Sequence, residues 1–141
     1  MGLDQYMYVA TRAGYHDEFW DGAEFNKDTG EFENPKMSKP REIAYRRKHP
    51  NLHGWMERLW LRKGAKQDDS THDFNGVELE LTWEDLDSLE YDVNNNLLPD
   101  TSGFFFGNNS DDYYREKDLE FIKNARAELF VGLKVFYNSS W

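Results

Sequence analysis

Alternation of apolar and polar residues predicts three strands. The clearest is 77–81, where three apolar residues are separated by Glu78 and Glu80, the period of two expected of a strand with one buried face. Residues 3–10 are rich in β-forming residues and apolar on both sides near their centre, which favours an inner strand. A further strand is predicted at 133–137.

Two helices are predicted on either side of Pro50. Over 51–62 the apolar residues fall on one arc of a helical plot, which indicates an amphipathic helix. A shorter helix is predicted at 40–48, because Glu42 and Arg46 have the favourable i,i+4 order. Pro50 is expected to separate the two, since it donates no backbone hydrogen bond and disfavours helical geometry before it.

Capping signals predict two more helices. Thr82 followed by Asp85 resembles a capping box and predicts a helix at 83–92. The last helix is expected to be capped by Ser110 and to reach about Phe130.

The remaining segments are irregular by pattern. Residues 14–37 are expected to form a long loop or a poor hairpin, and 66–75 an acidic linker. Several aromatics suggest that 14–37 packs against the domain: Phe19, Trp20, Phe25 and Phe32. The element order predicts one α+β domain over 1–141, with helices on one face of a small, mainly antiparallel sheet of three to four strands.

Composition narrows the class of protein. The 141 residues are 38% hydrophobic and include no cysteine, which excludes a disulfide scaffold and a thiolate metal site. No apolar run approaches the roughly 18 residues of a membrane-spanning helix, and the first residues lack the character of a secretory signal. We therefore expect a soluble protein of the cytoplasm that makes no contact with a membrane.

Charge is distributed in blocks. Residues 38–66 carry nine basic and two acidic side chains, whereas 67–112 carry thirteen acidic and no basic ones. The net charge is −10, which disfavours direct nucleic-acid binding because phosphates are repelled. The blocks either neutralise each other within the fold or present a surface to a partner.

Several short sequence blocks follow one another in a characteristic order along the chain. They are Met1 to Asp4 with Tyr6 and Tyr8, Ala44 to Lys48 with His53 and Trp55, Leu98-Pro99, Ser102 to Gly107, Asp112 to Tyr114, Asp118-Leu119 and Ser139 to Trp141. In this order they resemble a family of small uncharacterised proteins of bacteriophages and prophages. The chain departs from that pattern at Arg46, where a Trp is expected, and at Pro50, which interrupts a stretch that is usually helical. The resemblance implies a phage or mobile-element origin, a host-cell cytoplasmic location and no established activity.

Two residues are candidates for catalysis. His53 lies at the edge of the apolar arc of its helix. It is interpreted either as a structural histidine or as a general acid or base. Asp118 falls inside the apolar face of the last helix, so its carboxylate needs a partner, for which Arg47 or His53 is expected. The pair either fixes helix packing or belongs to a polar pocket for an anionic ligand.

That pocket would use five residues as ligand-binding groups: Arg47, Lys48, His53, Tyr114 and Asp118. No metal site is expected. His49 and His53 have ligand spacing but enclose Pro50 and lack a following glutamate. No nucleotide-binding or hydrolase motif occurs, so no cofactor is expected.

Three functions remain open from the sequence. The first is a non-enzymatic interaction protein whose acidic 67–112 surface binds a basic host protein. The second is a small enzyme or ligand-binding domain that acts on an anionic small molecule through the Arg/Lys/His/Asp cluster. The third is an assembly factor anchored by Trp141, and the sequence leaves the oligomeric state open.

Overall fold

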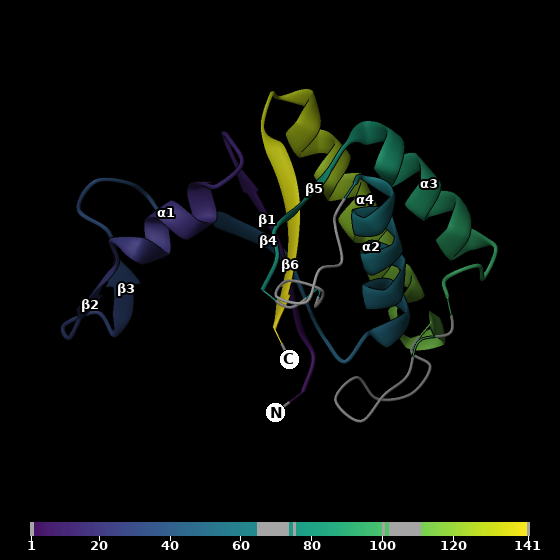
Figure 1. Ribbon diagram of the computed structural model, residues 1–141, viewed down its shortest axis with the longest axis horizontal. Coiled ribbons are helices and arrows are strands. Elements are labelled where there is room, and N and C mark those ends of the chain that lie inside the picture. Colours follow the sequence, from purple (N-terminus) through teal and green to yellow (C-terminus); the bar gives the residue numbers. More distant parts are fainter. Residues whose placement is uncertain (1, 65–73, 75, 100, 102–110, 141) are drawn as a thin grey trace.

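A four-stranded antiparallel sheet forms the centre of the molecule (Figure 1). The computed structural model describes residues 2–64, 74, 76–99, 101 and 111–140, without the side chains of 111 and 112. The strands of the sheet are β1 (Asp4–Ala10), β4 (Arg41–Arg47), β5 (Leu79–Leu81) and β6 (Lys134–Ser140). Their order is β4-β1-β6-β5, so β1 is an inner strand, as the sequence predicted.

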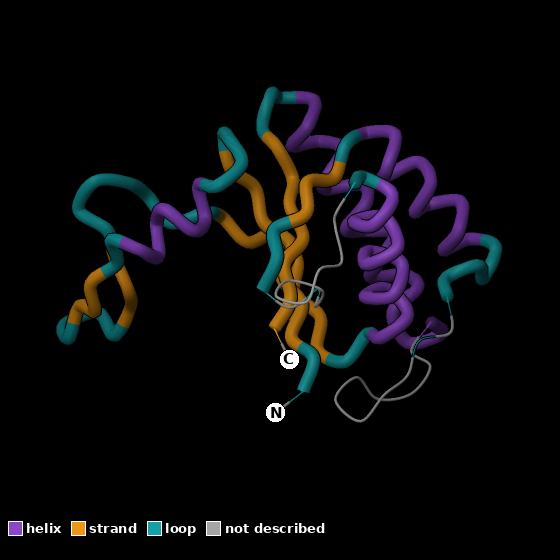
Figure 2. The backbone as a smooth tube through the Cα atoms, in the orientation of Figure 1, coloured by secondary structure: helices purple, strands orange, loops and turns teal. Residues whose placement is uncertain are grey.

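Three helices cover one face of this sheet (Figure 2). They are α2 (Pro50–Arg62), α3 (Trp83–Asn94) and α4 (Asp111–Phe130). The main core lies between them and the sheet, with contributions from every one of these elements except β4, whose Ile43 and Ala44 pack at its margin. The α+β class, the antiparallel sheet and the one-sided helix layer are therefore confirmed.

The predicted capping box is present at the start of α3. The Asp85 backbone N–H donates to the Thr82 hydroxyl, and the Thr82 backbone N–H donates back to the Asp85 carboxylate. The amphipathic helix at 51–62 is also confirmed, one residue longer than predicted. The proposed Ser110 cap lies outside the described residues.

The segment predicted as a short helix at 40–48 instead forms the strand β4 over Arg41–Arg47, so that prediction is wrong. β4 pairs with β1 from Asp4↔Arg47 to Val9↔Arg41. An i,i+4 ion pair adds only about 0.2–0.5 kcal/mol to a helix, which is too little to outweigh the pairing of this segment with β1. Pro50 accordingly begins α2 in its first turn and separates no helices.

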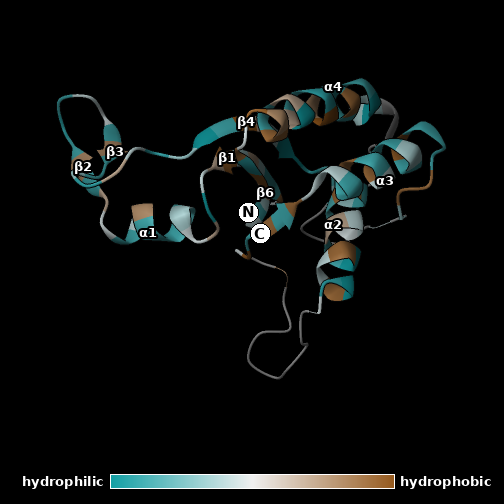
Figure 3. Ribbon diagram, turned by 90° about the horizontal axis from the view of Figure 1, so that it is seen from above, coloured by the Kyte–Doolittle hydropathy of each residue, from teal (hydrophilic) through white to brown (hydrophobic). Residues whose placement is uncertain are grey.

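Residues 14–37 are more regular than predicted. They form α1 (Tyr15–Asp21) and a hairpin of β2 (Glu24–Asn26) and β3 (Glu31–Glu33). We call this segment the arm. It lies on the side of the sheet opposite α2, α3 and α4 and extends away from it (Figures 1 and 3).

Most of the aromatics expected to pack the arm down remain exposed. Phe19 is buried, but Trp20, Phe25 and Phe32 are 39%, 54% and 47% exposed. Other sequence predictions fall largely or wholly outside the described residues: the acidic linker at 66–75, the Ser102 to Gly107 block and Trp141.

Candidate functional site

Asp118 is buried, as the sequence predicted, but with partners other than the expected ones. Its two carboxylate oxygens accept hydrogen bonds from Arg46 Nε at 3.2 Å and His49 Nε2 at 2.6 Å. The predicted partners, Arg47 and His53, do not fill this role. The reason is the strand at 40–48, because its period of two turns Arg46 inward and Arg47 outward.

The Asp118 cluster joins three elements. Arg46 also donates to the backbone oxygens of Tyr45 and Lys117, and the His49 ring stacks on Tyr114 with centroids 4.5 Å apart. Tyr114 in turn donates its hydroxyl to the Arg47 backbone oxygen at 2.6 Å. These bonds fasten α4 to the end of β4 and the start of α2. The buried pair thus fixes α4 against a strand, whereas the sequence suggested a pair that fixes the packing of two helices.

His53 belongs to a second set of buried hydrogen bonds, which the Gln5 side chain connects to the Asp118 cluster through the His49 backbone. Gln5 Nε2 donates to the Tyr137 hydroxyl oxygen at 3.2 Å, and that oxygen lies 2.9 Å from His53 Nδ1. Burial lowers the pKa of His53 to about 4. The ring is therefore neutral at pH 7, and its Nδ1 shares a hydrogen bond with the Tyr137 hydroxyl.

The five predicted ligand-binding residues do not meet in one open site. Asp118 and Tyr114 share one cluster, His53 lies in the other, and the side chains of Arg47 and Lys48 are exposed. A catalytic role for His53 or Asp118 stays a prediction. What the geometry supports for both is a structural role, because each is almost fully removed from solvent.

Several acids of the 67–112 block have cationic partners. Asp85 contacts Lys63, Glu80 contacts Lys134, and Arg126 bridges Asp87 and Glu90. This pairing leaves less unbalanced negative charge on α3 than the sequence suggested.

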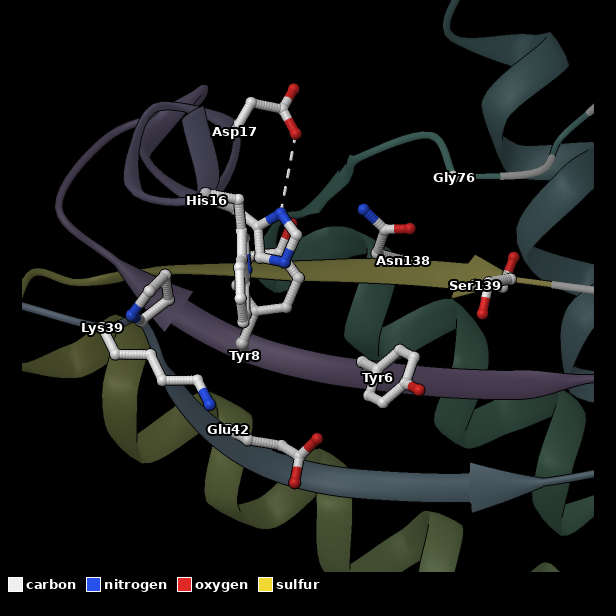
Figure 4. A pocket seen from close by; sticks show the side chains of 12 residues that line it. Tyr6, Tyr8, His16, Asp17, Lys39, Glu42, Gly76, Asn138 and Ser139 are labelled. Atoms are coloured by element: carbon white, nitrogen blue, oxygen red, sulfur yellow. Dashed lines mark ion pairs between the residues drawn. The ribbon is translucent and has the colours of Figure 1, made fainter. Parts of the chain in front are cut away.

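The uncovered face of the sheet offers a different site. A pocket of about 440 Å³ lies between β1, β6 and α1 (Figure 4). Tyr6 and Asn138 project into it from the strands, Glu42 from β4, and His16 from α1. Lys39 extends along the same wall, and its Nζ lies 5.4 Å from the ring centroid of Trp20.

Glu78 holds the base of the arm against this face. It accepts hydrogen bonds from the Tyr8 hydroxyl at 2.7 Å and from the Gly14 backbone N–H at 2.8 Å. Burial and the bond to Glu78 raise the pKa of Tyr8, so it stays a neutral donor. Tyr15 adds a bond from its hydroxyl to the Ser38 backbone oxygen. These bonds attach the start of the arm to Glu78 and hold its two ends together.

A continuous row of rings connects the sheet to the tip of the arm. It runs through Tyr8, His16, Trp20, Phe32 and Phe25, with successive centroids 4.8, 6.3, 5.5 and 5.2 Å apart. His16 and Trp20 are four residues apart on α1 and therefore share one face of it. The last three rings are exposed.

The exposed rings lie in acidic surroundings. In the β2–β3 hairpin Glu24 stands directly opposite Glu33, and Phe25 opposite Phe32. Like charges opposite each other on neighbouring strands are destabilising. The arm as a whole contains seven Asp and Glu against two Lys.

Sequence reasoning missed this surface although a signal was present. Phe25 and Phe32 are each flanked by polar residues and separated by a turn that ends at Gly30, which has φ of 75°. That is a short hairpin pattern with one apolar face. Nothing in the local pattern indicates that this face stays uncovered.

No group of three His, Asp or Glu side chains able to hold a metal ion occurs among the described residues. Nor does any helix in the described ranges have the length and apolar character needed to cross a bilayer. Comparisons with protein-family models, curated proteins and solved structures found no match. The resemblance to phage proteins stays a prediction.

Proposed function

We propose that this chain is a non-enzymatic interaction protein whose arm binds a basic partner protein. The observation that supports this most directly is the exposed row of Trp20, Phe32 and Phe25 on an acidic projection. Aromatic rings are enriched in the buried centres of protein interfaces, where a few of them supply most of the binding energy.

The charge of the arm favours a basic partner over other occupants. A second copy of this chain would bring two acidic arms together, and nucleic acid would bring phosphates against carboxylates. A cationic group placed between Glu24 and Glu33 would instead relieve their repulsion across the hairpin. From the resemblance to phage proteins we further propose that the partner is a host protein met in the cytoplasm.

The arm replaces the acidic 67–112 block as the proposed binding surface. On α3, acidic side chains form ion pairs with Lys63 and Arg126. On the hairpin, Glu24 and Glu31 are exposed. Because neighbouring positions of a strand point to opposite faces, the exposed glutamates lie on the face of the hairpin opposite Phe25 and Phe32. The carboxylates supply electrostatic steering, and the rings supply apolar area that binding can bury.

The test uses the full chain and a short soluble peptide that alternates arginine, serine and leucine. A peptide of the same length with glutamate in place of arginine is its control. We expect only the basic peptide to bind in a calorimetric titration at about 50 mM NaCl, and its affinity to fall at about 300 mM NaCl because salt screens exposed charges.

Two double variants locate the binding surface. Phe25→Ser with Phe32→Ser removes both exposed rings of the hairpin and should raise the Kd about tenfold. Tyr91→Ser with Glu84→Gln changes exposed residues of α3 and should leave the Kd within about twofold. Because all four side chains are exposed, both variants should unfold near the wild-type temperature. Equal binding of the two peptides, or a greater loss in the α3 variant, would overturn the proposal.

A further inference from the structure

The pocket at the base of the arm has the chemistry of a cation site. Rings form part of its lining, from Tyr6, His16 and Trp20, and the faces of aromatic rings attract cations. Glu42 contributes a carboxylate from β4, and Asp17 a second one at the rim beside His16 (Figure 4). Rings and carboxylates together favour a positively charged guest.

One wall of the pocket already binds a cation. The Lys39 ammonium lies 5.4 Å from the centroid of the Trp20 ring, a cation–π contact within the chain. Lys39 is exposed, so its side chain can move aside at little cost. The contact shows which group the Trp20 face accepts, and it also shows that a stronger cation would have to displace Lys39.

The polar groups that line the pocket come from several elements around it. Glu42 extends from β4, the Asn138 amide and the Ser140 hydroxyl belong to β6, and Asp17 belongs to α1. A guanidinium group presents five N–H donors in one plane and stacks on aromatic rings, whereas an ammonium is a compact point charge. A volume of about 440 Å³ accommodates the planar group together with part of its aliphatic stem.

We infer that the pocket between β1, β6 and α1 receives the guanidinium group of an arginine side chain on the basic partner. This inference rests on the proposed function and deepens it. The exposed rings of the arm provide apolar contact area, and the pocket at its base selects arginine. Trp20 belongs to both parts, since it contacts Phe32 on one side and lines the pocket on the other.

The first experiment uses a capped glycine-arginine-glycine peptide as the probe. The matched control carries citrulline, which keeps the shape of arginine but replaces the guanidinium by a neutral urea group. Titrations of the full chain at constant ionic strength are followed by NMR. We expect the arginine probe to shift the Trp20 indole and Tyr6 backbone signals with a Kd in the millimolar range, and citrulline to bind at least about fivefold more weakly.

Two variants then separate a cation site from an anion site. Lys39→Met removes the competing ammonium and should lower the Kd of the arginine probe about threefold, whereas Glu42→Gln should raise it about threefold. Glu84→Gln on α3 makes the same charge change far from the pocket and should leave the Kd unchanged. Equal binding of arginine and citrulline, or weaker binding after Lys39→Met, would overturn the inference.

The outcomes distinguish this inference from the proposed function. If the arginine probe fails to bind while the longer basic peptide still depends on Phe25 and Phe32, the arm is the binding surface and the pocket is not an arginine site. If the probe binds as expected but the Kd of the longer peptide is unchanged in the Phe25→Ser, Phe32→Ser variant, the pocket is an arginine site and the proposed role of the arm is wrong.

Discussion

Arg46 and Asp118 lie 72 positions apart in the sequence and meet in a buried ion pair between β4 and α4. The Arg46 guanidinium also donates to two backbone oxygens, so its charge is matched by several acceptors. His49 supplies the second hydrogen bond to the carboxylate. The pair connects an edge strand to the longest helix of the described chain.

Loss of the Asp118 charge should destabilise the fold strongly. Asp118→Asn leaves the Arg46 charge buried without its counter-ion, which costs about 3–5 kcal/mol of unfolding free energy. Urea unfolding followed by tryptophan fluorescence measures the change. The control is Asp87→Asn, which removes the charge of an exposed carboxylate paired with the partly exposed Arg126 and should cost less than about 1 kcal/mol. Similar midpoints for the two variants would contradict a structural role for Asp118.

Gly54 should tolerate no side chain despite its place in a helix. A Cβ at this position would lie 1.9 Å from the Thr101 hydroxyl oxygen and 3.3 Å from Pro99, which cross the face of α2. Alanine normally stabilises a helix relative to glycine by ~1 kcal/mol, but here we expect Gly54→Ala to lower the stability by about 1–3 kcal/mol. Ser88→Ala, at an exposed position of α3, is the control and should be neutral or slightly stabilising. Thermal unfolding that shows both variants to be stabilised would disprove the close approach.

His53 should make the fold sensitive to acid. Its pKa is lowered by burial from 6.5 to about 4, so below about pH 6.5 the unfolded chain binds a proton that the folded chain does not. The unfolding free energy therefore does not depend on His53 titration above about pH 6.5 and decreases as the pH falls from there toward 4. The loss is on the order of 3 kcal/mol.

Unfolding free energies measured at about pH 7, 6, 5 and 4 test this expectation. His53→Asn keeps an acceptor for Tyr137 but does not titrate, so its stability should fall less steeply over this interval. The two proteins are compared by the slope of unfolding free energy against pH, because the smaller side chain also leaves a cavity that lowers the stability at every pH. Parallel slopes for the two proteins would show that His53 titrates normally.

Tyr45 should ionise unusually late for a surface tyrosine. Its hydroxyl donates to Asp4 at 2.5 Å, and this hydrogen bond, with some burial and the Asp4 charge, raises its pKa to about 12. Asp4→Asn removes the charged acceptor and should move the pKa back toward 10.0. NMR of ring-labelled tyrosine gives the titration, and Tyr45→Phe assigns the signal. A Tyr45 pKa that is the same with and without the Asp4 carboxylate would refute this account.

The elements that the sequence predicted correctly depend on residues close together in the chain. The alternation around Glu78 and Glu80 and the apolar arc of 51–62 are visible in short windows, as is the exchange of hydrogen bonds between Thr82 and Asp85. The inward position of Asp118 also follows from the helical period alone. For the same reason the α+β class and the one-sided helix layer could be predicted.

Tertiary structure alone decided the features that depend on distant partners. Whether 40–48 forms a helix or a strand was settled by pairing with β1, and that choice selected Arg46 over Arg47 as the partner of Asp118. Exposure of Phe25 and Phe32 depends on what the rest of the chain covers, which no local window contains. Backbone pairing and burial are properties of the whole chain, so the arm and its pocket became visible only in three dimensions.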